Sequence, residues 1–142
     1  MDAALWAKAH GATTHFPLAL VVCSGALDAA GFVLANRLNA RADGLRAAGY
    51  WTMIGGALGS VPAVVSGLLM TKGSVLGHGA LRMHHLFVWP AFALIVGLAM
   101  WRVLAGKRAT RPMFGGYLAG VGAAATLVLA AGFWGGEMMI AL

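Results

Sequence analysis

The chain has 142 residues, of which 61% are hydrophobic and only 10% are charged. Soluble domains carry about 25% charged residues, so this composition indicates a single membrane-embedded domain rather than a soluble protein. The net charge of +6 does not indicate nucleic-acid binding, because the basic residues lie at the ends of apolar runs, where membrane proteins carry them. A single cysteine excludes an intrachain disulfide.

Four apolar stretches follow one another along the chain. Each is long enough to supply the ~20 helical residues that cross about 30 Å of hydrocarbon. They cover roughly residues 16–36, 47–70, 84–103 and 114–138. The connections within the first pair and within the second pair are short. We therefore expect an all-α membrane protein in which residues 1–142 form one four-transmembrane-helix bundle of two helical hairpins.

The first stretch opens with the sequence TTHFP. Thr13 or Thr14 is expected to cap the first helix, and Pro17 suits its first turn. His15 would then be held at a helix terminus.

Asp28 is the one acid well inside a span. Because an unpaired carboxylate is costly within a membrane, we expect it to face inward. It would be protonated there, or hydrogen-bonded to Thr52, Ser24 or a neighbouring backbone group. A proton or polar relay through Asp28 and Glu137 is one interpretation.

The arginines and lysines are unevenly distributed between the two ends of the predicted bundle. Seven belong to the two short connections, namely Arg37, Arg41, Arg46, Arg102, Lys107, Arg108 and Arg111. The other end carries Lys8, Lys72 and Arg82. The positive-inside rule places the seven in the cytoplasm. We therefore expect both termini outside, on the periplasmic face of a bacterial inner (cytoplasmic) membrane.

All five histidines fall at the predicted outer end of the bundle, as does Glu137. They are His10, His15, His78, His84 and His85. Imidazoles carried on different helices of a bundle can hold a heme iron or a simple metal ion between them, and can also move protons. The alternative is that they anchor helix ends at the membrane boundary.

His84 and His85 are adjacent, and consecutive helical residues point about 100° apart. We therefore expect one of them to turn inward and the other toward water or a second cofactor. His15 and His85 each precede a basic residue of a short connection by 22 residues, which favours these two as a pair.

The stretch HGATTHFPLAL, residues 10–20, resembles the signature of a bacterial family of four-helix membrane proteins: histidine, four residues, then histidine–phenylalanine–proline. Asp28 resembles an acid in that family's first helix, and its third helix opens with a histidine that matches His84 or His85. The sequence Gly135-Gly136-Glu137 resembles a motif near its end. The family is labelled a predicted membrane domain of unknown function, so the resemblance implies a fold rather than an activity.

The chain departs from this family pattern at two positions. Gly11 stands where the family often has proline, and Met70 stands where it often has aspartate. The overall layout is also similar to small b-type cytochromes, whose four-helix bundles hold heme between histidines. That second similarity is architectural.

The favoured function is a membrane b-type cytochrome, or a cytochrome-like subunit, that transfers electrons between a quinol pool and an outer-face redox partner. We expect one heme b bound by His15 and by His85 or His84. A second heme held by His10 with His78 or His84 is the alternative. Covalent c-type heme is excluded because there is no CxxCH sequence.

Two other classes of function fit the same residues. One is a copper- or iron-handling membrane protein that uses the histidines and nearby methionines. The other is a cofactor-free accessory or anchoring subunit. In all three cases the partners are membrane lipid and either quinone, a periplasmic redox protein or other membrane subunits, without nucleic acid. Whether the chain is an enzyme stays open, since any substrate chemistry would belong to another subunit.

Overall fold

The computed structural model describes residues 3–35 and 39–140, and within them the chain is almost entirely helical. The long helices are α1 (Ala3–Leu34), α2 (Asn39–Met70), α3 (Gly79–Leu104) and α4 (Arg111–Ile140), and a short 3-10 helix, η1 (Gly106–Arg108), joins the last two. All four long helices are long and apolar enough to cross a membrane. The predicted all-α fold of four spanning helices is confirmed.

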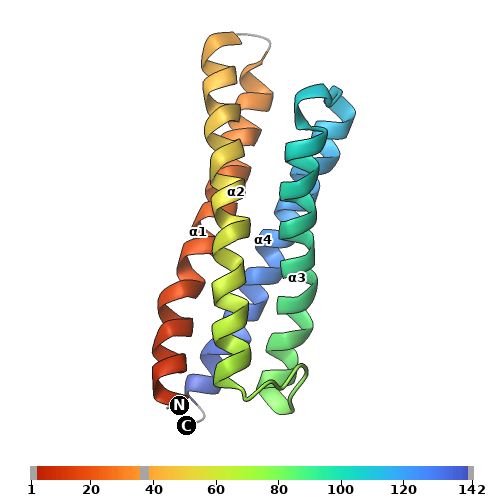
Figure 1. Ribbon diagram of the computed structural model, residues 1–142. Helices are drawn as coiled ribbons and strands as arrows, with labels where there is room; N and C mark the ends of the chain where they lie inside the picture. The colour runs from red at the N-terminus through yellow and green to blue at the C-terminus, as the bar shows by residue number, and fades with distance from the viewer. Residues whose placement is uncertain (1–2, 36–38, 141–142) are drawn as a thin grey trace.

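The helices form two hairpins, α1–α2 and α3–α4, that stand side by side (Figure 1). The start of α1 and the end of α4 lie at the same end of the bundle as the α2–α3 connection, residues 71–78 (Figure 1). We call this the histidine end. The opposite end, where residues 104–111 join α3 to α4, is called the arginine end.

Every helix is longer than the apolar stretch that predicted it. The largest difference is in α1, which begins at Ala3 instead of near residue 16. The predicted cap is therefore wrong, because Thr13 and Thr14 lie inside the helix. Their hydroxyls donate to the carbonyls of Ala9, at 2.9 Å, and Gly11, at 3.3 Å. A threonine that bonds back to the preceding turn satisfies its own polar group, so it does not end a helix.

Packing is extensive within each hairpin and sparse between the hairpins. Glycines allow the close approach of α1 and α2. A Cβ at Gly56 would lie 2.9 Å from Val21, and one at Gly49 would lie 2.6 Å from Asp28. Each helix contacts the two beside it, α1 with α2 and α4, and α3 with α4 and α2. Helices α1 and α3 therefore face each other across the diagonal of the bundle.

The buried apolar core lies toward the arginine end. Its members are Val21, Met53, Ile95, Ala99, Phe114, Tyr117, Val121 and Ala124. Large apolar side chains such as Phe16, Val33, Trp51 and Leu129 are instead exposed on the outer surface of the bundle. This distribution is expected of helices that face lipid, because lipid tails are as apolar as the side chains themselves.

Candidate functional site

Two polar junctions connect α1 with α3, one near each end of the bundle. On α1, His10 precedes Asp28 by 18 residues, and on α3, His84 precedes Arg102 by 18 residues. Eighteen residues make about five helical turns, so both members of each pair lie on the same face of their helix, about 27 Å apart along its axis. Helices α1 and α3 therefore face each other with polar residues at two heights, one near each end of the bundle.

At the histidine end, the side chain of His10 on α1 packs against α2. Its Nδ1 lies 2.9 Å from the carbonyl oxygen of Ala63 and 3.4 Å from the hydroxyl of Ser66. Its ring lies against Gly67, where a Cβ would come within 2.9 Å of the imidazole Cε1. Because a carbonyl only accepts, Nδ1 carries the hydrogen. In the neutral ring, Nε2 is then left with its lone pair.

His84 of α3 makes the corresponding contact with α4. Its Nδ1 donates to the carbonyl oxygen of Ala131 at 2.7 Å. A Cβ at Gly135 would lie 3.4 Å from the same nitrogen. The neutral His84 imidazole is therefore fixed in the same tautomer as His10, with Nε2 left as the acceptor.

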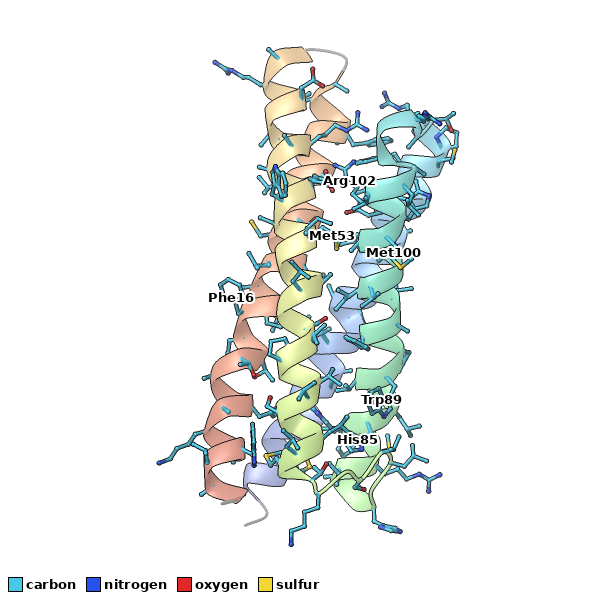
Figure 2. The ribbon with its side chains drawn as sticks, viewed as in Figure 1. Phe16, Met53, His85, Trp89, Met100 and Arg102 are labelled. Atoms are coloured by element: carbon cyan, nitrogen blue, oxygen red, sulfur yellow. The ribbon has the colours of Figure 1, made fainter. Side chains whose placement is uncertain are left out.

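These two rings and a third form one group, which we call the histidine cluster: His10, His84 and His85. The centroids of His10 and His84 are 6.4 Å apart with an interplanar angle of 80°, and those of His84 and His85 are 5.8 Å apart. His85 is only 6% exposed, its Nδ1 has no hydrogen-bond partner, and its ring lies beside Trp89 (Figure 2). Of the adjacent pair, His85 is thus the buried member and His84 is half-buried.

The remaining predicted site residues lie outside the cluster. His15 is exposed, and its Nδ1 donates to the carbonyl oxygen of Gly11 in its own helix at 2.8 Å. His78 and Glu137 are also exposed. The structure does not bring His15 to His85, the pair that the 22-residue spacing favoured. Because α1 runs unbroken through both positions, His15 points about 140° away from His10.

The three histidines are not arranged as a three-ligand metal site. Among residues 3–35 and 39–140, no group of three or more histidine, cysteine, aspartate or glutamate side chains is placed to hold a metal ion.

The second junction, at the arginine end, is an ion pair across the same diagonal. Asp28 is fully buried, and Arg102 Nη2 donates to its Oδ1 at 2.7 Å. The hydroxyl of Tyr117 on α4 donates to the other carboxylate oxygen at 3.0 Å. The same Arg102 nitrogen also donates to the backbone carbonyl of Arg46 on α2, at 2.9 Å. One carboxylate and its arginine therefore connect all four helices.

The inward orientation predicted for Asp28 is confirmed, but its predicted partners are wrong. The Thr52 hydroxyl bonds within its own helix, and Ser24 donates to the carbonyl oxygen of Gly49 at 2.8 Å. Arg102 was expected to belong to a cytoplasmic connection, whereas its side chain is 6% exposed (Figure 2). Arg102 lies about five turns after His84, so the two side chains share one face of α3. This spacing indicates from sequence that Arg102 faces inward. Of the other predicted connection residues, Arg37 and the side chain of Lys107 lie outside the described residues.

The family model described as a predicted membrane protein (DUF2231) matches residues 8–141. The chain belongs to this family. The match confirms the resemblance to a four-helix membrane family, and its description names no activity. The searches of curated proteins and of solved structures found no match. Both junctions of this DUF2231 protein lie within the matched region.

Proposed function

We infer that this protein binds one heme b at the histidine cluster and serves as an electron-transfer subunit in the membrane. The observation that supports this most is the state of two imidazoles on different helices. His10 and His84 each donate Nδ1–H to a backbone carbonyl, and so leave Nε2 unprotonated. Metal-ligating histidines are oriented by this kind of outer hydrogen bond, which also fixes the tautomer.

The separation of the two rings supports the same proposal. The centroids of His10 and His84 are 6.4 Å apart, so two imidazoles from different helices lie close enough for one group to be held between them. This pair replaces His15 and His85 as the histidines that would hold the heme.

The number of protein ligands favours heme over a simple metal ion. A protein-bound zinc or copper ion usually takes three or four protein ligands, and no group of three is placed to bind one in the described part of the chain. A heme iron needs only its axial ligands from the protein, because the porphyrin supplies the others. Two facing imidazoles are sufficient for heme and insufficient for an isolated ion.

The two proposed ligands belong to different hairpins, His10 to α1–α2 and His84 to α3–α4. Gly67 and Gly135 let the His10 and His84 rings lie directly against the neighbouring helix. The two hairpins contact each other sparsely. This sparse packing supports the proposal that a flat group could enter between the hairpins and be held by one histidine from each.

A bound heme would supply reversible one-electron chemistry at this place. The protein's own contribution is the orientation of two imidazoles and the burial of His85, whose free Nδ1 is available for a further hydrogen bond. The cluster lies at the end of the bundle that the positive-inside rule assigns to the outside. On that basis we propose quinol as electron donor, and a periplasmic redox protein or another membrane subunit as acceptor. His15 and His78, both exposed, give no support for a second heme.

Heme content of matched histidine variants tests the proposal. The protein, purified in detergent from cells supplied with a heme precursor, should show b-type bands and a pyridine-hemochrome ratio near one heme per chain. His10→Ala and His84→Ala should each lose most of this heme. His15→Ala, on the same helix as His10 but exposed, is the matched control and should keep it.

Two results would contradict heme binding by this pair. One is an unchanged heme ratio in His10→Ala. The other is a colourless wild-type protein that stays colourless after addition of hemin. Metal analysis of a colourless protein would then distinguish a copper- or iron-handling protein from a cofactor-free accessory subunit.

A further inference from the structure

Three guanidinium groups gather around two stacked phenylalanines at the arginine end. The guanidinium carbons of Arg46 and Arg102 lie 4.3 Å and 4.9 Å from the ring centroid of Phe114. Arg111 lies 4.6 Å from that of Phe32, and the two rings stack at 6.0 Å. These side chains come from all four helices, and we call them the arginine–phenylalanine group.

The positive charge of this group exceeds the negative charge beside it. Asp28 pairs with Arg102, and this is the one ion pair within residues 3–35 and 39–140. The half-buried Arg46 side chain has the Phe114 ring beside it and no hydrogen-bond acceptor among the described residues. Arg102, 6% exposed, keeps a buried Nε without a partner.

The guanidinium of Arg46 and the Nε of Arg102, which have no acceptor among the described residues, point to an anionic ligand. Buried polar groups are normally hydrogen-bonded, and charged groups inside a membrane protein are normally paired. A guanidinium presents its donors in a planar fork that matches the oxygens of a phosphate. Helix α4 begins at Arg111, so the positive end of its dipole lies at the same place and also favours an anion.

We propose that the arginine–phenylalanine group binds the phosphate of an anionic membrane lipid, with Arg46 as the ligand. The neighbouring surface favours a lipid over a free phosphate ion. Trp51 on α2 and Met100 on α3, which lie on the bundle-centre side of Arg46 and Arg102, are 68% and 57% exposed. These apolar side chains offer a surface for acyl chains next to the guanidinium groups, which a soluble ion would not use.

Arginine variants that remove equal charge test this site. In detergent, the wild-type protein should bind phosphatidylglycerol more tightly than phosphatidylcholine, as read by native mass spectrometry and by thermal stabilisation. Arg46→Gln keeps the Cβ and Cγ that pack against Gly31, and should weaken phosphatidylglycerol binding by about ten- to a hundred-fold, the range of a hydrogen bond to a charged group. Arg41→Gln removes one charge from an exposed position on the same helix, and should weaken it by at most about five-fold.

The result that would overturn the proposal is an equal loss in Arg46→Gln and Arg41→Gln, because that pattern indicates diffuse attraction to the basic end. Inorganic phosphate added alone should give no stabilisation. A full effect of inorganic phosphate would contradict the lipid assignment and identify a soluble anion as the ligand. Arg46→Lys, which keeps the charge without the planar fork, should recover only part of the affinity. None of these measurements involves heme, so their outcome is independent of the histidine cluster.

Discussion

The carboxylate of Asp28 is a buried charge whose partners both belong to the other hairpin, Arg102 on α3 and Tyr117 on α4. Removal of one member of such a pair leaves the other charge buried and uncompensated, which costs about 3–5 kcal/mol in proteins. Asp28→Asn should therefore destabilise the folded bundle by about that amount. Denaturation by SDS in mixed micelles, followed by circular dichroism, measures it. Asp43→Asn, an exposed acid on α2, is the control and should change stability by less than about 0.5 kcal/mol.

A double variant tests whether the ion pair itself causes the loss. The asparagine of Asp28→Asn can still accept the Tyr117 hydroxyl, so the main defect in that variant is the uncompensated charge of Arg102. Adding Arg102→Met removes that charge and should restore part of the lost stability, as replacement of buried ion pairs by apolar side chains often does. If the two losses simply add, the charge of Arg102 is not compensated by Asp28, and the loss in Asp28→Asn has another cause.

At the scale of the helices, Gly49 sets how closely α2 approaches α1. A Cβ at this position would lie 2.6 Å from an Asp28 carboxylate oxygen, whereas one at Gly44 would have nothing within 4 Å. Gly49→Ala should therefore destabilise the protein by about 1–3 kcal/mol through overpacking. Gly44→Ala, on the same helix, should stabilise it by up to about 1 kcal/mol because alanine favours the helical state. Thermal unfolding of both variants measures the contrast, and equal behaviour would contradict the close approach.

The number and pairing of the helices could be predicted from sequence, but their starts could not. Apolar run length marks the part of a helix that sits in hydrocarbon, and α1 continues for about four turns beyond it. The residues of that extension, among them Lys8, His10 and Thr13, are polar enough to resemble a connection. They stay helical because Thr13 bonds to its own backbone and His10 to that of α2.

The candidate site was predictable only in part. The sequence places five histidines at one end, but which of them meet depends on the rotation of each helix. His10 and Asp28 lie five turns apart on the inward face of α1, as His84 and Arg102 do on α3. This 18-residue spacing predicts the correct faces. The 22-residue spacing that favoured His15 and His85 instead joins each histidine to a basic residue in a connection between helices. It therefore does not indicate which face of the helix the histidine occupies.

For the whole molecule, the spacing of the two polar junctions predicts where the membrane lies. About 27 Å separates them along the helices, close to the thickness of the hydrocarbon layer, about 30 Å. We therefore expect each junction to lie near one membrane face, with the apolar outer surface between them. In that placement the buried ionisable groups would stand at the edges of the hydrocarbon and face the interior of the bundle.

Orientation is the remaining property of the whole molecule, and the basic residues predict it. Three exposed arginines, Arg41, Arg108 and Arg111, lie at the arginine end, and the positive-inside rule assigns this end to the cytoplasm. The native Cys23 is exposed, so it is first replaced by alanine. Ala40→Cys then reports the arginine end without removing a charge, and Ser74→Cys reports the histidine end.

In intact bacterial cells, a membrane-impermeant maleimide that crosses the outer membrane should label the cysteine at position 74. The cysteine at position 40 should react only after the inner membrane is permeabilised. Thermal unfolding of each variant serves as a check that the bundle is intact. Labelling of position 40 in intact cells, with position 74 protected, would reverse the orientation. The histidine cluster would then face the cytoplasm, and the proposed periplasmic electron acceptor would have to be replaced by a cytoplasmic one.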